Sequence, residues 1–316
     1  MAFTQSQYAR AHLFLATRVV TMMGRKFEEG DWAEVYCAAK DIPLVGWSNL
    51  NIDIVYRGLG VEHKMLCYRA TTVMEACGTT LMHPSLTRSV RIPSVEADPN
   101  SVMRDVLTQY GELVELRRMR VRTTAEGAEP DMRTGWLLWQ ASLREFLYFE
   151  EEMLAPNPDD YRAEWRESGG GGRKTSRNLW VYEKDTGKKR YSVTTSAGAK
   201  IQPYLDVPPP DDPFLYRFVV QGLHLGDNLV RIWVAANTAR ELSGLVGSLE
   251  PGELSSAILH AAREASTEPG EAELQAETAQ PLEITKEAYE VMKQTWVGVS
   301  DEHSVELLIR ALRRAT

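Results

Sequence analysis

The feature that most restricts the fold of this chain is a pair of apolar segments joined by a glycine-rich turn. Residues 50–56 and 61–68 have strand-like patterns, and the connection between them is Arg57-Gly58-Leu59-Gly60. Because glycine adopts positive φ without a Cβ clash, this sequence predicts a β-hairpin. Both segments also carry charged side chains among their apolar ones. Such charges are costly in a buried sheet unless they are paired or bind a metal.

Helical patterns are predicted on both sides of this hairpin. Apolar residues at near-helical spacing indicate an opening helix within residues 6–25, and Asp31 is the expected N-cap of a second helix that carries Glu34. Asn100, after a proline, is the expected cap of a later helix. These helices should pack around the sheet of the hairpin. The predicted helices after the first cover residues 32–39, 71–81, 101–119 and 133–153.

Four consecutive glycines follow Ser168 and predict a boundary, because they leave the backbone nearly unrestrained. The chain beyond them is expected to be rich in strands and to include a second hairpin. Residues 264–283 contain six glutamates and no basic residue, which is typical of a solvated linker. A final helical segment is expected over residues 286–314. Strands are predicted over residues 178–182, 189–195, 214–221 and 229–235.

Composition excludes several classes of protein. Lysine and arginine total 36 against 44 acidic residues, a net charge of -8, so a uniformly basic coat is excluded. The three cysteines form no CxxC pair, which argues against a disulfide framework or a zinc ribbon. No apolar run is long enough for a membrane span, and the N-terminus does not resemble a signal peptide. No Walker loop, HExxH or GxSxG motif occurs, so an ATP motor, a zinc hydrolase and an α/β-hydrolase are not indicated.

The charged residues of the first hairpin form the candidate site. Glu62 and Lys64 are two apart on the second strand and therefore share one face. Asp53 lies on the first strand and can approach that face across the turn. Two carboxylates and an ammonium group are then expected to converge. Mg²⁺ prefers carboxylates, waters and phosphate oxygens, so the sequence predicts a magnesium site here.

The arrangement Asp53-x8-Glu62-His63-Lys64 resembles the PD-(D/E)xK nuclease superfamily, which includes most type II restriction endonucleases. Ile52 stands where that family usually has proline, and the separation of eight residues is at the short end of its range. The similar order of helix, hairpin and helix covers roughly the first 80 residues. The resemblance implies an α/β fold with a restriction-endonuclease-like core, in which helices flank a mixed central sheet. A β-rich DNA-recognition region and a helical C-terminal segment complete the expected fold.

The resemblance also implies roles for the site residues. Asp53 and Glu62, with the backbone carbonyl of His63, are expected to hold Mg²⁺ at the scissile phosphate. Lys64 is expected to position and acidify the attacking water, and the products are expected to carry 5′-phosphate and 3′-hydroxyl ends. The His63 side chain should pack on the opposite face of the strand. Glu34 is either a further ligand of the metal or its water, or a solvated helix residue.

A basic stretch beyond the glycines is the expected DNA-contacting surface. Residues 173–200 contain eight basic residues against two acidic ones. A two-stranded ribbon can enter the major groove, although a lysine-rich hairpin can also simply protect a sheet edge. Two other basic runs, residues 117–122 and 87–91, are expected to be ordinary surface. The predicted DNA-binding residues are Arg173, Lys174, Arg177, Lys188, Lys189, Arg190 and Lys200.

These observations predict three parts: a nuclease core (1–167), a β-rich DNA-recognition region (168–263), and an acidic linker with a C-terminal helix (264–316). It is left open whether the second part also completes the core. The expected protein is a Mg²⁺-dependent type II restriction endonuclease of double-stranded DNA. By resemblance it is a homodimer in the bacterial cytoplasm.

Two alternatives remain. One is a modification-dependent, repair or structure-specific nuclease of the same fold. The other is a non-catalytic DNA-binding protein in which the charged residues of the hairpin form only a structural ion network or a surface salt bridge. Dependence on Mg²⁺ separates the second alternative from both kinds of nuclease.

Overall fold

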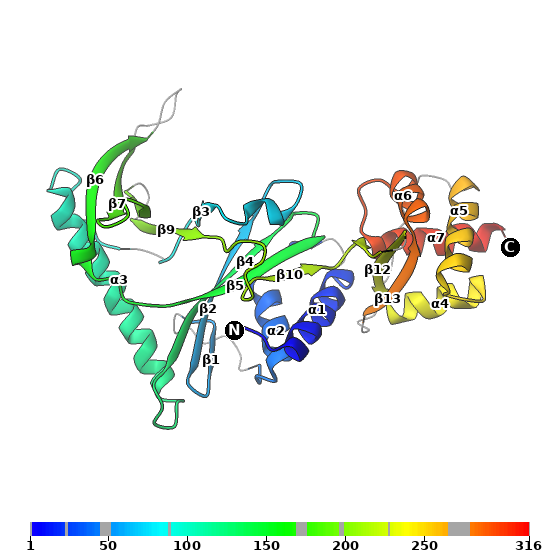
Figure 1. The fold of residues 1–316 in the computed structure, drawn as a ribbon, viewed down its shortest axis with the longest axis horizontal. Helices are drawn as coiled ribbons and strands as arrows, with labels where there is room; N and C mark the ends of the chain where they lie inside the picture. Colours follow the sequence, from blue (N-terminus) through cyan, green and yellow to red (C-terminus); the bar gives the residue numbers. More distant parts are fainter. Residues whose placement is uncertain are drawn as a thin grey trace.

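The computed structural model describes residues 2–22, 25–44, 52–87, 90–168, 176–195, 199–226, 228–264 and 279–315. Strands in these residues form three sheets, of five, five and three strands. The two larger sheets lie together with the first three helices, and the smallest sheet lies with the last four helices at the other end of the molecule (Figure 1). The predicted α/β class is confirmed.

The central sheet is mixed. Strands β2 and β4 are parallel, and the other neighbouring strands are antiparallel. Helices α1 (Gln5–Val20) and α2 (Glu29–Lys40) pack on one face of it through a shared apolar core. In spatial order the strands are β1 (Ile54–Tyr56), β2 (Leu59–Cys67), β4 (Asp131–Trp139), β5 (Glu145–Glu152) and β10 (Tyr216–Val219).

The first predicted hairpin is confirmed. Strands β1 and β2 are antiparallel, with Ile54 opposite Val61, and Gly58 in the turn has a φ of 83°. Residues 50 and 51 of the predicted first strand lie outside the described residues. Strand β1 has three residues and forms the edge of the sheet, whereas β2 has nine. Part of the outer edge of β2 therefore extends beyond its partner strand.

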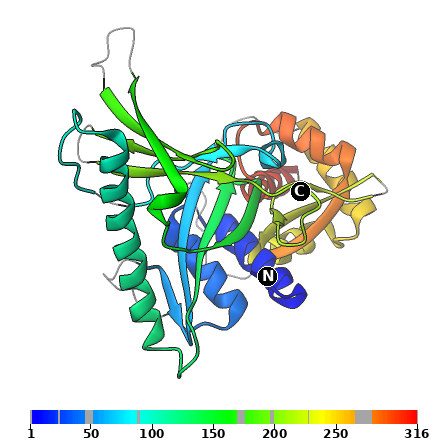
Figure 2. The same ribbon diagram turned by 60° about the vertical axis from the view of Figure 1, so that its left-hand side comes forward.

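The second sheet is bent against helix α3 (Pro99–Arg122), which lies along one of its faces (Figure 2). Its strands β7 and β8 form the second predicted hairpin, which is confirmed. Ser168 and Ser176, on the two sides of the glycine segment, are opposite each other in neighbouring strands. The segment thus connects two strands of one sheet. In spatial order the strands are β3 (Thr80–Met82), β9 (Lys200–Asp206), β8 (Lys189–Thr194), β7 (Ser176–Glu183) and β6 (Tyr161–Ser168).

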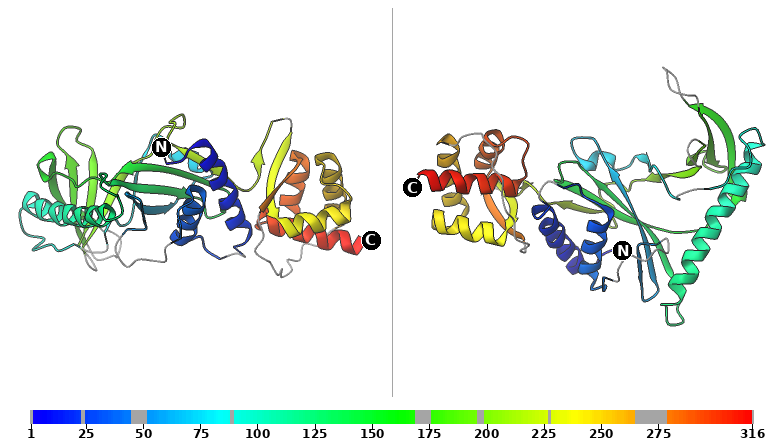
Figure 3. Two further views of the ribbon diagram at one scale, coloured as in Figure 1. Left: turned by 90° about the horizontal axis from the view of Figure 1, so that it is seen from below. Right: turned by 180° about the vertical axis from the view of Figure 1, so that it is seen from behind.

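The C-terminal part has its own apolar core between a small sheet and four helices (Figure 3). The expected linker ends in a strand, β13, which pairs with β12 along its length, so the prediction of a solvated linker is wrong for residues 279–283. The expected final helix is two helices, interrupted near Gly298, where φ is 81°. The elements are β11 (Leu223–His224), β12 (Leu229–Ala235), α4 (Ala236–Val246), α5 (Pro251–Glu264), β13 (Ala279–Thr285), α6 (Lys286–Thr295) and α7 (Asp301–Ala315).

The helix predicted over residues 133–153 is wrong, because this segment forms strands β4 and β5. Strand β4 lies between two other strands, and its side chains are buried on both faces. Leu137 and Trp139 belong to the core beneath α1 and α2, whereas Trp136 and Leu138 belong to a core on the other face. A strand buried on both faces lacks the alternation of polar and apolar residues that identifies strands in a sequence.

The helix predicted over residues 71–81 is also wrong. This segment contains a short 3₁₀ helix, η1 (Val73–Ala76), and strand β3. A second 3₁₀ helix, η2 (Pro158–Asp160), immediately precedes β6. Neither turn is long enough to give the apolar periodicity of an α-helix.

Two predicted helix caps are corrected. Helix α2 begins before Asp31, and the Asp31 side chain instead accepts a hydrogen bond of 2.8 Å from the backbone N of Glu28. Asp98, rather than Asn100, caps α3 by accepting a hydrogen bond of 2.8 Å from Ser101 N. Both helices are nevertheless present where helices were expected.

Gly135 on β4 permits close packing beneath α2. A Cβ at this position would clash with the Tyr148 hydroxyl group and lie 2.8 Å from His63 Cδ2. We expect Gly135→Ala to lower the free energy of unfolding by about 1–3 kcal/mol through overpacking. Chemical denaturation measures this change. The control, Gly244→Ala on α4, has open space around the new Cβ and should raise stability by about 0.5–1 kcal/mol. Equal effects of the two substitutions would contradict this packing.

Candidate functional site

The candidate site lies where β1 ends and β2 continues, among the described strands, as the edge of the central sheet. Asp53 directly precedes β1, and its Oδ2 accepts a hydrogen bond of 2.6 Å from the backbone N of His63. The Asp53 carboxylate thus accepts a hydrogen bond from the β2 backbone directly beyond the last residue pair of the β1–β2 ladder. A backbone contact that follows from the hairpin register therefore fixes the position of this side chain.

Glu62 and Lys64 share one face of β2, as the alternation of strand residues predicts. Lys64 Nζ donates to Glu62 Oε1 at 2.6 Å. Arg117 Nη2, from α3, donates to the same oxygen at 2.9 Å. Glu62 is 6% exposed and Arg117 is 5% exposed, so this ion pair is removed from water. The prediction that Arg117 belongs to an ordinary surface run is wrong.

The His63 side chain lies on the opposite face of β2, as predicted. It is fully buried and packs against the rings of Trp32, Tyr36 and Tyr148. Burial lowers the pKa of His63 to about 3, so the ring is neutral at physiological pH. Within the described part of the chain, neither ring nitrogen has a hydrogen-bond partner. The imidazole is therefore part of the core, and only the backbone of His63 faces the site.

The carboxylates at this edge perturb one another. Partial desolvation by the surrounding protein, together with the negative charges of Glu62 and Glu29, raises the pKa of Asp53 to about 7. Part of the residue is still exposed to solvent. Burial and the charge of Glu62 also raise the pKa of Glu29, while the charge of Lys64 lowers it. Glu29 therefore lies within electrostatic reach of the other three residues. A concentration of negative charge of this kind is an environment that favours a bound cation.

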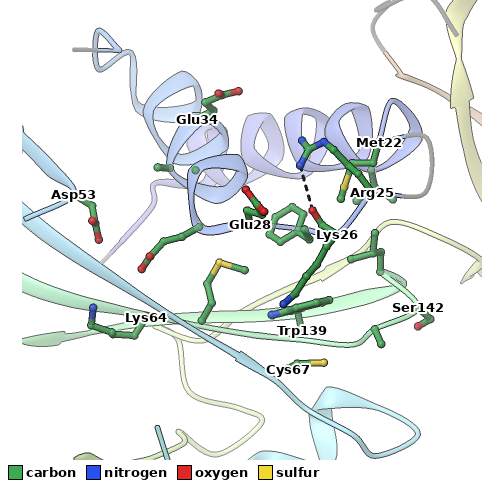
Figure 4. A pocket seen from close by; sticks show the side chains of 18 of the residues that line it. Met22, Arg25, Lys26, Glu28, Glu34, Asp53, Lys64, Cys67, Trp139 and Ser142 are labelled. Carbon is green, nitrogen blue, oxygen red and sulfur yellow. Dashed lines mark hydrogen bonds between the residues drawn. The ribbon is translucent and has the colours of Figure 1, made fainter. Parts of the chain in front are cut away.

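The helix glutamate at the site is Glu29 and not the predicted Glu34. Glu34 forms an ion pair with Arg18 of α1, and its side chain is 50% exposed. Figure 4 shows Glu34 farther along α2, directed away from Asp53 and Lys64. No signal in the sequence pointed to Glu29, because the second helix was expected to begin only after this residue.

Asp53, Glu62, Lys64 and Arg117 line one end of a cleft with a volume of about 2630 Å³. The cleft extends past α2 and Trp139 to the start of α7, where residues 300–303 also line it. In Figure 4 the charged ends of Asp53, just before β1, and Lys64, on β2, point toward one another. A cleft of this volume has room for part of an extended substrate beside Asp53 and Lys64.

Among the residues that the structure describes, no group of three or more His, Cys, Asp and Glu side chains is arranged to hold a metal ion. Mg²⁺ in proteins is, however, commonly bound by one or two carboxylates, with waters and substrate phosphates as its other ligands. Asp53 and Glu62 provide two hard oxygen donors at one edge, and the raised pKa of Asp53 indicates negative charge that a cation can relieve. The residues present therefore fit this ion.

The predicted DNA-binding residues are in part engaged within the protein. Arg173 and Lys174 lie outside the described residues. Lys189 lies over the ring of Trp180, 3.2 Å from its centroid, and burial lowers the pKa of Lys189 to about 8. Lys200 is exposed. Three others form ion pairs: Arg177 with Glu96 (3.0 Å), Lys188 with Asp206 (3.3 Å), and Arg190 with Glu183 (2.6 Å) and Asp206 (2.9 Å).

These ion pairs reduce the positive charge that the second hairpin offers to a phosphate backbone. Among the described helices, none combines the length and the apolar character that crossing a lipid bilayer requires.

Comparisons with protein-family models, curated proteins and solved structures found no match to this chain.

The raised pKa of Asp53 predicts how stability changes with pH. Because the pKa of Asp53 is higher in the folded than in the unfolded state, the folded state binds this proton more tightly. The protein should therefore lose stability as pH rises from about 4 to about 7. Asp53→Asn removes this ionisation. We therefore expect the variant to be more stable than the unmodified protein at pH 8 and equally stable near pH 4, in denaturant titrations with a chelator present. Lower stability of Asp53→Asn at pH 8 would contradict the repulsion described here.

Proposed function

We propose that this protein is a Mg²⁺-dependent endonuclease that hydrolyses phosphodiester bonds of double-stranded DNA. The observation that carries the proposal is the convergence of Asp53, Glu62 and Lys64 at the edge of β2 beyond β1, next to a large cleft. Two carboxylates with an adjacent ammonium group match the chemistry of metal-assisted phosphate hydrolysis. The parallel pairing of β2 with β4, across the connection that contains α3, supports a restriction-endonuclease-like core.

Each of these residues has a role in the proposal. Asp53 and Glu62 hold Mg²⁺, which when bound neutralises negative charge on the phosphate under attack. The N–H and C=O of one strand residue point to the same edge, and the N–H of His63 points to Asp53. The His63 carbonyl is therefore directed to the same edge and is a further oxygen donor. Lys64 orients the attacking water and lowers its pKa, and the products carry 5′-phosphate and 3′-hydroxyl ends.

The more specific proposal is a type II restriction endonuclease. The hairpin of β7 and β8 carries aromatic and basic side chains on a sheet that α3 connects to the site. This sheet is the candidate surface for contacts with the DNA backbone and bases. Action as a homodimer in the bacterial cytoplasm follows from the resemblance alone, because two-fold protein symmetry suits a palindromic site.

One observation favours a second candidate function. Glu62 is buried and receives hydrogen bonds from both Lys64 and Arg117, which is also what a structural ion network in a non-catalytic DNA-binding protein would show. Such a network needs no metal ion. Dependence on Mg²⁺ therefore separates the two candidate functions.

The decisive experiment incubates the purified chain with unmodified phage DNA and with a methylated counterpart, each with and without Mg²⁺. Mapping the ends of the fragments follows. Discrete bands that require Mg²⁺ support a sequence-specific endonuclease, and the methylated substrate shows whether modification blocks or enables cleavage. DNA that stays intact on both substrates with Mg²⁺, while the protein still binds it, favours the non-catalytic alternative.

Two glutamates of α2 provide a matched test of the site. Glu29→Gln removes a negative charge near Asp53 and Glu62, so it should raise the Mg²⁺ concentration needed for half-maximal cleavage by about 10-fold, as changes next to metal ligands do. Glu34→Gln removes only the ion pair with Arg18 and should leave this concentration unchanged. A larger effect of Glu34→Gln than of Glu29→Gln would show that the wrong glutamate has been assigned.

A further inference from the structure

We infer that Arg117 is a positioning residue of the metal site, which holds the Glu62 carboxylate in the orientation that binds the ion. This assignment rests on the proposed function, because it concerns the same carboxylate. The motif that the sequence resembles consists of the aspartate, the glutamate and the lysine. Arg117 is outside that motif and comes from a helix that follows the hairpin by more than thirty residues.

The contact between Arg117 and Glu62 is direct and buried. Arg117 Nη2 donates to Glu62 Oε1 at 2.9 Å, and the two side chains are 5% and 8% exposed. Met153 Sδ lies 4.0 Å from the other terminal nitrogen of Arg117, a weak contact. In the described part of the chain, Arg117 Nε is buried without a hydrogen-bond partner. Glu62 is thus the one strong anionic partner that the structure shows for this guanidinium group.

The position of Arg117 is fixed by the packing of α3. On either side of it along the helix, Val114 and Val121 are buried in the core that α3 shares with the second sheet. An arginine remains charged under all physiological conditions and offers its donors in a rigid planar group. Arg117 therefore presents to Glu62 a donor whose position is set by the core and not by the cleft.

Arg117 gives Glu62 a donor that does not depend on Lys64. In the structure Lys64 Nζ bonds to the same oxygen, Glu62 Oε1, at 2.6 Å. This bond uses one of the three donors of the ammonium group, so Lys64 can orient a water molecule with another. Lysine has a long flexible stem, and when it moves, the bond from Arg117 still holds the Glu62 carboxylate. Groups that hydrogen-bond to metal ligands typically contribute 10-fold to 100-fold to metal affinity.

The test measures binding of Mg²⁺ alone to the full chain by calorimetry, without DNA, for the unmodified protein, Arg117→Lys and Arg117→Met. We expect Arg117→Met to weaken Mg²⁺ binding by 10-fold to 100-fold, and Arg117→Lys to recover part of that loss. Arg118→Lys, the neighbouring residue on α3, is the control and should bind Mg²⁺ as the unmodified protein does. Thermal unfolding with a chelator present shows which variants are folded.

The outcomes separate this inference from the proposed function. Failure of the unmodified protein to bind Mg²⁺ would overturn the metal site itself, and the role of Arg117 with it. Tight binding by the unmodified protein and equally tight binding by folded Arg117→Met would overturn only the role of Arg117. If neither Arg117 variant folds, Arg117 is a structural residue and the inference is likewise overturned.

Discussion

The Lys64→Ala protein is expected to bind DNA like the unmodified protein but to cleave it about 10³-fold more slowly, which is typical for loss of a group that assists proton transfer. Lys64 is the cation on β2 beside both carboxylates. It lies in the central sheet, whereas the DNA contacts are proposed on the second sheet. Single-turnover cleavage and a binding assay with Ca²⁺ in place of Mg²⁺ measure the two properties separately.

The same comparison applies to the carboxylates. Asp53→Ala and Glu62→Ala each remove a proposed metal ligand, so they should abolish cleavage and spare DNA binding. The control is Lys286→Ala, an exposed lysine at the start of α6 in the C-terminal part, which should leave cleavage unchanged. Cleavage by the Lys64→Ala protein at the rate of the unmodified protein would refute the assignment of this residue.

The second large effect is expected at Phe3, close to the N-terminus. This side chain is 2% exposed, and five aromatic rings surround it. Phe3→Ala should lower the free energy of unfolding by about 3–5 kcal/mol, because it removes a large ring and leaves a cavity. Denaturant titration measures the loss. The rings are those of Trp32, Tyr36, Tyr148, Tyr216 and Phe218.

Phe214→Ala is the matched control for Phe3. Phe214 is 49% exposed. Its substitution should lower the free energy of unfolding by less than about 0.5 kcal/mol, as surface substitutions usually do. Phe3 joins α2 to β5 and β10, so its loss should loosen the packing of α2 on the sheet. Equal destabilisation by the two substitutions would mean that the N-terminal segment does not complete this core.

Sequence reasoning located the local part of the site. Glu62 and Lys64 share a face because strand residues alternate, and Asp53 approaches them because the hairpin is short and antiparallel. Both relations depend on residues fewer than a dozen positions apart. The placement of the His63 ring on the opposite face follows from the same alternation.

Sequence reasoning could not find Arg117 or choose between Glu29 and Glu34. Arg117 reaches Glu62 only because α3 packs between the two larger sheets. From the sequence, a charged residue in a basic run is expected on the surface. The family resemblance suggested Glu34 as a ligand, but its side chain turns to Arg18 of α1. The direction of α2 relative to the hairpin decides which glutamate faces the site, and that direction is set by packing.

The sequence by itself determined the two hairpins, the start of the chain as a helix, and the shared face of Glu62 and Lys64. These features depend on turn residues and on the period of side chains along a strand or helix, which are local properties. Only the tertiary structure decided that residues 133–153 form strands β4 and β5, and that Arg117 completes the charged site. The physical reason is that burial on both faces of a strand, and the approach of a distant helix, arise from long-range packing that leaves no periodic signal in the sequence.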